Sequence, residues 1–202
     1  YIAALDIPGH AEKTASEAVA LLTAQHCPID TVRDIIIGGP QLALQVHESC
    51  GHPIELDRVL GAEAAYAGTS FLTPDKLNNF NYGSRYINIT ADSLRHPGLG
   101  TFGWDDEGVE AQSTPIVKDG RFVGYLMSRE TASSLGLTSN GCVRAASWNR
   151  LPMIRMTNVS LEPGTWELDD LIADTEDGLL METNRSWSID DRRYNFQFGT
   201  EM

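Results

Sequence analysis

The chain has 202 residues, of which 42% are hydrophobic and 21% charged, as is ordinary for a globular protein. Its formal net charge is -13, from 28 acidic and 15 basic residues, and it holds no long run of Lys or Arg. Because phosphate backbones are bound by clustered basic side chains, this charge argues against direct binding of DNA or RNA.

Cysteine usage and apolar patterning give further expectations about the class of protein. The three cysteines, Cys27, Cys50 and Cys142, are too few and too irregularly spaced for a disulfide framework. The N-terminus has no signal-peptide pattern, and no apolar stretch approaches the roughly 20 residues that cross a bilayer. We therefore expect a cytoplasmic protein without a membrane span. The sequence opens without a methionine and closes on strand-like RRYNFQFGTEM, so we expect a piece of a longer protein.

The first third of the sequence is predicted to be mainly helical. Good helix formers over residues 11–25 predict a helix, and residues 31–37 predict a strand. Residues 41–52, QLALQVHESCGH, predict a largely buried helix that bends or stops near Pro53, because proline disfavours a helical residue before it. Residues 54–67 are compatible with a second helical stretch.

From residue 69 onward, short β-rich runs alternate with turn signals. The segment PIVKDGRFVGYL predicts a β-hairpin, with Asp119-Gly120 suited to a type I′ turn. Residues 152–162 predict a strand, residues 166–174 a short helix, and the tail returns to strands.

These elements sum to a single α+β domain over residues 1–202, built mostly of antiparallel β-sheet, with one helix carrying a His-Glu-x-x-x-His motif in the first third. The tryptophans are expected in the core: Trp104, Trp148, Trp166 and Trp187.

Residues 47–52, His-Glu-Ser-Cys-Gly-His, form a dense cluster of side chains that can bind a metal. A catalytic zinc requires neutral imidazole ligands and a nearby carboxylate that accepts a proton from water. The five-residue spacing places His47 and His52 about 140° apart on an ideal helix, so the helix must be distorted if they share a metal. A π-bulge would bring them to one side. Gly51 lowers the barrier to such a distortion, and Pro53 interrupts the hydrogen-bond ladder.

Several alternatives remain open from the residues alone. The two histidines could instead be surface or capping residues. Cys50 could be a fortuitous ligand, a redox-sensitive thiol or a small buried residue, and Cys142 could act as a third ligand if the fold brings it near His47. The acidic run Asp105-Asp106-Glu107 could be an ion-binding turn or a solvated loop. Arg155 could form an ion pair or grip a substrate carbonyl.

The segment HESCGHPIELDRVLG resembles the signature of the TldD/PmbA family. Further stretches match the family in order, including GTFGWDDEGVEAQSTPIVKDGRFVGYLMSRETA, LPMIRMTNVSLEPG and ELDDLIADTEDGLLM. The resemblance implies a zinc-dependent metallopeptidase acting on unfolded or small peptides, with His47 and His52 as metal ligands and Glu48 as general base. Because TldD-type subunits keep this motif, it also implies a PmbA- or TldE-type partner subunit that lacks it.

The chain departs from the family pattern in its extent. The family's third zinc ligand is a cysteine in a glycine-rich stretch near the C-terminus, and this sequence stops before such a stretch. The N-terminal domain of a full-length member is missing as well. The alternative function is therefore a non-catalytic peptide-binding or scaffold subunit of a TldD/PmbA-type complex.

Overall fold

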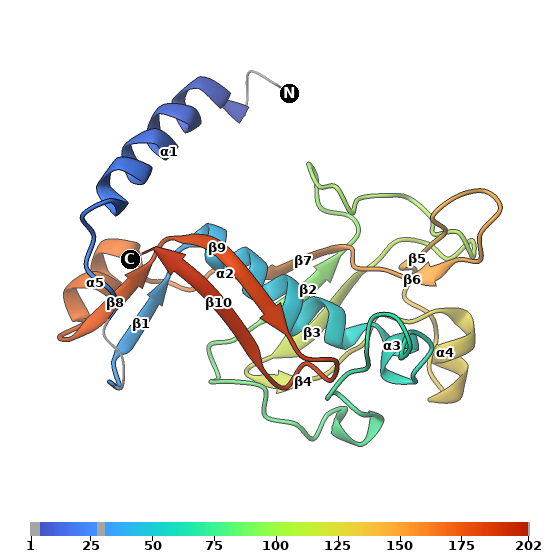
Figure 1. Cartoon of the computed structure of the whole chain (residues 1–202). Coiled ribbons are helices and arrows are strands. Elements are labelled where there is room, and N and C mark those ends of the chain that lie inside the picture. Colours follow the sequence, from blue (N-terminus) through green and yellow to red (C-terminus); the bar gives the residue numbers. More distant parts are fainter. Residues whose placement is uncertain (1–4, 28–30, 202) are drawn as a thin grey trace. The chain divides into compact units, whose positions relative to one another are not determined.

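The computed structural model describes residues 5–27 and 31–201, which belong to two compact units, Tyr1–Arg33 and Asp34–Met202. The first unit holds helix α1, Ile7–Leu21 (Figure 1). This confirms the helix predicted over residues 11–25, with both ends shifted toward the N-terminus. The single domain over residues 1–202 stays a prediction, and the second unit is described by itself below.

The second unit mixes short helices with short strands (Figure 1). Its α-helices are α2 (Gly39–Gln45), α3 (Leu56–Val59), α4 (Arg129–Ser134) and α5 (Leu168–Asp174). Its strands are β1 (Asp34–Ile37), β2 (Ile89–Asp92), β3 (Ser113–Lys118), β4 (Arg121–Phe122), β5 (Val143–Arg144), β6 (Met153–Ile154), β7 (Asn158–Leu161), β8 (Gly178–Met181), β9 (Thr183–Ile189) and β10 (Phe196–Glu201).

The strands pair mainly in antiparallel fashion. A four-stranded sheet has the order β4-β3-β2-β7, and β5–β6 and β9–β10 are antiparallel pairs, whereas β1 and β8 pair in parallel. The predicted hairpin turn is confirmed, because Asp119 and Gly120 have φ angles of 49° and 77° between β3 and β4. The α+β class with mostly antiparallel sheet is therefore confirmed.

Two predicted elements are shorter than expected. The helical stretch over residues 54–67 reduces to α3, because Gly61 adopts a φ of +90° and the chain turns away. The strand over residues 152–162 is two strands, β6 and β7, since the chain changes partner from β5 to β2 at residues 155–157. This change of partner sheet carries the chain past the helix that bears the histidines, and that helix contacts β7.

The core of the second unit joins the segment after the His-Glu-x-x-x-His motif to the four-stranded sheet. Leu56 N donates to Leu126 O at 3.0 Å, and Leu126 N donates to Ile54 O at 2.9 Å. The largest fully buried side chains include Ile54, Leu56, Leu72, Ile89, Ile116, Phe122, Tyr125, Leu126 and Ile154. This hydrophobic core fixes the C-terminal end of the motif helix against the sheet.

The tryptophan prediction is wrong. Exposed fractions are 95% for Trp148, 68% for Trp104, and 55% for both Trp166 and Trp187. Aliphatic side chains, Phe122 and Tyr125 fill the core, while the tryptophans lie in connecting segments or on the hairpin strand β9. No helix among the described residues is long and apolar enough to cross a membrane.

Candidate metal centre

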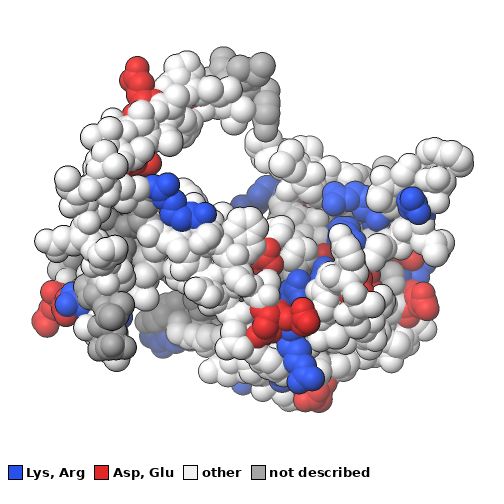
Figure 2. All heavy atoms as spheres, in the orientation of Figure 1, with Lys and Arg blue, Asp and Glu red and all other residues white. Residues whose placement is uncertain are grey.

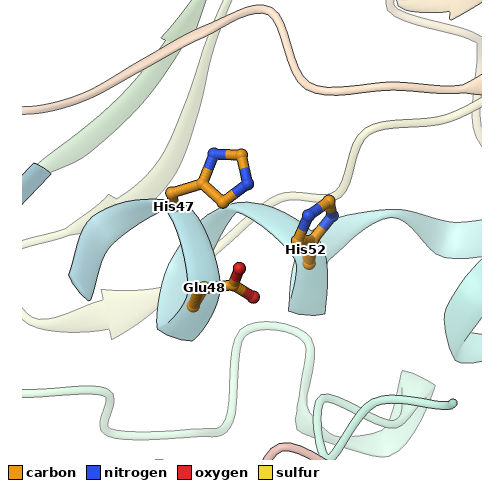
Figure 3. Close-up of side chains that lie close together, drawn as sticks. All are labelled: His47, Glu48 and His52. Atoms are coloured by element: carbon orange, nitrogen blue, oxygen red, sulfur yellow. The ribbon is translucent and has the colours of Figure 1, made fainter. Parts of the chain in front are cut away.

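The motif helix changes its winding where the two histidines lie. Helix α2 is followed by a π-helical turn, Val46–Gly51, and then by a 3₁₀ turn, His52–Ile54. A π turn takes one extra residue, so positions five apart return to the same side. Figure 3 shows both imidazoles on one side of the helix, with the Glu48 carboxylate turned toward His52. The predicted π distortion is confirmed.

A half-buried tyrosine binds the backbone of the turn that precedes Pro53. Pro53 has no N–H, so the regular ladder of an α-helix, in which it would donate to the carbonyl of Ser49, is interrupted there. The hydroxyl of Tyr82 donates to the carbonyl of Ser49. Burial, together with the neighbouring Cys50, raises the pKa of Tyr82 well above its usual range, so the hydroxyl remains a donor. The Tyr82 hydroxyl thus connects its own loop to a backbone carbonyl of the distorted turn.

Gly51 permits close packing at the same turn. Its backbone is right-handed helical, with φ of −68°, so no unusual conformation requires glycine there. A Cβ at this position would lie 2.0 Å from Sδ of Met156, in the segment between β6 and β7. The structure therefore gives Gly51 a packing role, and its backbone conformation by itself does not require glycine.

The side chains of His47, Glu48 and His52 form a set of donors that fits a metal ion. Their ligand atoms all lie within 4.8 Å of one another. The two imidazole centroids are 4.7 Å apart, with an interplanar angle of 84°. Within residues 5–27 and 31–201, no other group of three His, Cys, Asp or Glu side chains meets this criterion. Two imidazoles and a carboxylate are the donor types of catalytic zinc sites.

The electrostatics of His47 favour its neutral form. Loss of hydration on partial burial, followed by the nearby His52, lowers the pKa of His47, although Glu48 and Glu55 act in the opposite direction. His47 is the most exposed of the three side chains, and Glu48 and His52 are half-buried. A neutral imidazole is the form that binds a metal.

Glu55 fixes the orientation and tautomer of His52. Nδ1 of His52 lies 3.0 Å from Oε2 of Glu55, whose side chain is fully buried. Nη2 of Arg58 lies 3.4 Å from the same nitrogen but 2.7 Å from the Glu55 carboxylate. Because an ionised carboxylate can only accept, we assign the hydrogen of the neutral ring to Nδ1. The Nε2 lone pair of His52 is then available for a metal.

A chain of buried ion pairs supports Glu55. Arg58 pairs with Glu55 at 2.7 Å and with Glu63 at 2.8 Å, and Glu63 also pairs with Arg155 at 2.9 Å. Although burial by itself raises the pKa of Glu55, the hydrogen bond from His52 and the charges of His52 and Arg58 outweigh it and lower that pKa. The network holds the carboxylate ionised beside His52. It also confirms the ion-pair reading of Arg155.

The candidate centre opens into a cavity of about 660 Å³. The cavity is lined by the titratable side chains of His47, His52 and Glu55 and by apolar and polar residues around them. These are Ala43, Leu99, Gly100, Arg144, Arg155, Met156, Thr157, Asn158 and Val159. A neighbouring cavity of about 930 Å³ lies between α3, α4 and the β5–β6 pair, and Arg144 and Arg155 line both cavities. The pair of hollows leaves room for an extended ligand beside the histidines.

The remaining candidates lie elsewhere and hold the scaffold together. Asp105 is buried and accepts from the amides of Glu107, Val109 and Val143, so the solvated-loop alternative is wrong for this residue, whereas Asp106 is exposed. Cys142 is buried with Sγ 3.5 Å from Met127 O, and it is not part of the group formed by the histidines. Cys50 is buried, as expected of a small core residue.

Two residues that shape the centre, Glu55 and Tyr82, were not predicted from the sequence. Glu55 lies three positions after His52, a spacing that places a carboxylate one helical turn away, and this signal was available in the sequence. Tyr82 comes from a loop with no local motif. Its contact with Ser49 depends on a tertiary approach that sequence spacing does not encode.

Comparison with known proteins shows the family to which the chain belongs. Residues 34–202 match the model of the PmbA/TldA metallopeptidase C-terminal domain. A metalloprotease of Methanocaldococcus jannaschii is 34% identical over 185 residues, covering 91% of this chain and 39% of that protein. A zinc metalloprotease TldD homolog of Saccharolobus solfataricus is 28% identical over 148 residues, covering 73% of this chain and 31% of that protein. The chain thus spans well under half the length of these relatives.

Solved structures show the same fold. TldE from Thermococcus kodakarensis superposes with a TM-score of 0.68 at 21% identity, covering 82% of this chain and 36% of that one. A Thermotoga maritima protein described as a modulator of a DNA gyrase gives 0.70 at 22% identity, with 85% and 36% covered. The family model matches most of the chain, and so the protein belongs to the PmbA/TldA metallopeptidase family, as its motifs indicated.

Proposed function

We propose that this chain carries the metal site of a zinc-dependent, TldD-like metallopeptidase, with His47 and His52 as metal ligands and Glu48 as general base. The observation that carries the proposal is the convergence of these ligand atoms within 4.8 Å across a π-helical turn. A regular helix would separate the two histidines. A local distortion that unites two imidazoles and a carboxylate is typical of a functional site.

The chemistry that zinc supplies when bound is Lewis-acid activation of water and of the scissile carbonyl. The side chain of Glu48 is half-buried beside His52, where it can accept a proton from the attacking water. As the C–N bond breaks, the same carboxyl group returns that proton to the leaving amine nitrogen. Glu55 holds the His52 ring throughout, so Nε2 keeps its direction toward the site.

We also propose that this site belongs to a longer protein that works with a partner subunit. We infer that the chain is part of a longer TldD-like protein, since it covers 39% of its relative from Methanocaldococcus jannaschii. The longer protein would add an N-terminal domain and a C-terminal segment with a further ligand. Its substrates would be unfolded or small peptides, and its partner a PmbA- or TldE-type subunit.

Two measurements on the full-length protein test the proposal. The first is zinc content by elemental analysis of the wild type, His47→Ala and His52→Ala. The expected result is close to one zinc per chain in the wild type and a large loss in both variants. Absence of zinc from a folded wild type would contradict the proposed metal site.

The second measurement separates a peptidase from the scaffold alternative. Glu48→Gln keeps the size of the side chain but removes its ability to accept the proton. The expected result is peptide hydrolysis reduced by a factor of about 100 or more, because general-base catalysis typically contributes 10²–10⁴-fold. Hydrolysis that is unchanged in Glu48→Gln would refute the catalytic assignment and favour a peptide-binding scaffold.

A further inference from the structure

Arg144 stands apart from the other charged side chains of the metal-site cavity. Glu55 is paired with Arg58, and Arg155 is paired with Glu63. Arg144 is exposed and has no ion pair or hydrogen bond from its guanidinium within the described parts of the chain. Among the charged side chains of the cavity wall, this guanidinium is the one without an ion-pair partner in the described parts of the chain.

The backbone that carries Arg144 is held on both sides. Val143 N donates to Oδ2 of Asp105 at 3.1 Å, and Ala145 N donates to Oδ2 of Asp106 at 2.6 Å. Asp106 N donates in turn to Val143 O at 3.1 Å. The acidic run noted in the sequence therefore fixes the strand position of Arg144. A long exposed side chain on a fixed backbone loses less freedom on binding than one on a mobile loop.

The position of Arg144 suits contact with a bound peptide. It lines both the cavity of the histidines and the larger neighbouring cavity, so it stands where the two adjoin. The first cavity offers the apolar side chains of Leu99, Met156 and Val159 beside it. In Figure 2, Lys and Arg atoms are visible near the part of the surface where Figure 1 labels β5 and β6. A peptide leaving the metal site toward the larger cavity would pass this guanidinium.

We propose that Arg144 is a specificity-determining residue that binds a carboxylate of the peptide substrate. This inference rests on the proposed peptidase function of the same site. A planar guanidinium forms paired, charge-assisted hydrogen bonds with a carboxylate. The chain as a whole carries a net charge of -13 and repels acidic ligands. The local positive charge of Arg144 therefore provides the position in the cavity at which a carboxylate can bind.

The carboxylate has two sources in a peptide, an acidic side chain or the free C-terminus. Three fluorescent peptides of one sequence distinguish them: a neutral peptide with Gln and a C-terminal amide, the same peptide with Glu in place of Gln, and the neutral peptide with a free C-terminus. Dissociation constants are measured by fluorescence anisotropy on the zinc-loaded full-length protein with its partner subunit. The Glu48→Gln background prevents turnover, so the measurement does not depend on hydrolysis.

The expected result is that one carboxylate peptide binds about tenfold more tightly than the neutral peptide, a difference typical of one charge-assisted contact. Arg144→Gln removes this preference while zinc content stays unchanged. Arg150→Gln is the matched control, since Arg150 is exposed and lines the larger cavity but not that of the histidines. Arg150→Gln is expected to leave the preference for the carboxylate peptide intact.

Equal binding of all three peptides by the wild type, a preference that persists in Arg144→Gln, or binding of none of them overturns the proposal. These outcomes are separate from failure of the proposed function, which appears in zinc content and in the hydrolysis assay. A preference lost in Arg144→Gln, in a protein whose hydrolysis proves independent of Glu48, still identifies Arg144 as a carboxylate site.

Discussion

The hydroxyl of Tyr82 donates to the carbonyl of Ser49, four residues before Pro53. The residues are far apart in the chain, yet this contact lies inside the turn that brings His47 and His52 together. Proline cannot donate a backbone hydrogen bond, so it interrupts the regular ladder of the helix at this turn. The tyrosine therefore stabilises the π-helical geometry on which the candidate metal site depends.

Tyr82→Phe tests this relationship. Loss of the hydroxyl leaves the Ser49 carbonyl without its donor, so we expect the free energy of unfolding to fall by about 1–3 kcal/mol. We also expect weaker zinc binding, because the turn that sets the distance between the histidines relaxes. Chemical denaturation and competition with a chelator measure the two effects.

Tyr86→Phe is the control for that substitution. Tyr86 is 73% exposed, and its hydroxyl accepts from Arg85 on the surface, so its loss should leave both stability and zinc binding close to wild type. If Tyr82→Phe behaved like Tyr86→Phe, the hydroxyl would have no part in holding the turn.

Gly51→Ala tests the close packing of the motif helix. The new methyl group would meet Sδ of Met156 at 2.0 Å, so the Met156 side chain or the helix must shift. We expect a loss of about 1–3 kcal/mol in the free energy of unfolding, as for other overpacked cores. The double variant Gly51→Ala with Met156→Ala should lose less than the two single effects added together, since the clash is removed.

Gly39→Ala is the matched comparison in the same helical segment. No atom lies within 4 Å of a Cβ at Gly39, in the first turn of α2. Alanine is favoured over glycine in helices by up to about 1 kcal/mol, so this variant should be neutral or slightly more stable. Equal destabilisation by both substitutions would show that backbone freedom, and not contact with Met156, requires glycine in this helix.

The sequence predicted the parts of this site that depend on local rules. The five-residue spacing of His47 and His52 required a distorted helix, and Pro53 located the distortion, because both constraints act within one or two turns. The hairpin at Asp119-Gly120 was predictable for the same reason, since the turn type demands residues that tolerate positive φ.

The parts that were missed depend on tertiary contacts. Asp105 looks like a surface acid in the sequence, but it is buried by three backbone amides that come from its own turn and from β5. Trp148 looks like a core residue in the sequence, yet it is 95% exposed, and the core is filled by other side chains. The type of a residue indicates how often its side chain is buried. Whether a particular side chain is buried depends on its packing and hydrogen-bond partners, which come from distant segments of the chain.

The cysteines should differ sharply in reactivity. Cys142 is buried, and burial, with a smaller effect of Asp105 and other carboxylates, raises the pKa of its thiol well above the usual range. Cys27 is exposed. At pH 8 we expect iodoacetamide to modify Cys27 readily and Cys142 only after denaturation, as measured by peptide mass spectrometry. Equal rates at the two positions in the folded protein would contradict the buried placement of Cys142.

The same pKa shift predicts a dependence of stability on pH. The folded protein holds the Cys142 proton more tightly than the unfolded chain, where the thiol has its ordinary pKa of 9.0. Its contribution to stability is therefore fully present below about pH 9 and decreases progressively as the pH rises from that value toward the raised pKa of the folded state. Between pH 8 and 10, denaturation should show a smaller loss of stability in Cys142→Ala than in the wild type. A larger loss of stability in Cys142→Ala than in the wild type would contradict a raised pKa of Cys142 in the folded protein.

Glu55→Gln tests the carboxylate that orients His52. The amide keeps the size of the side chain but replaces the ionised acceptor of the Nδ1 hydrogen with a weaker one. Substitution of such supporting groups typically lowers metal affinity by about 10–100-fold, and we expect zinc affinity to fall within that range. Competition with a chelator on the full-length protein gives the affinity, and thermal unfolding of the metal-free form gives the stability separately.

Glu63→Gln is the matched control, because it belongs to the same buried network but does not contact His52. It pairs with Arg58 at 2.8 Å and with Arg155 at 2.9 Å, and its loss should lower stability while zinc affinity stays near that of the wild type. If both variants reduced zinc affinity equally, the network as a whole, rather than the hydrogen bond to His52, would set the geometry of the site. An effect confined to Glu55→Gln assigns the orientation of the ligand to this one carboxylate, since the two substitutions remove the same charge from the same buried cluster.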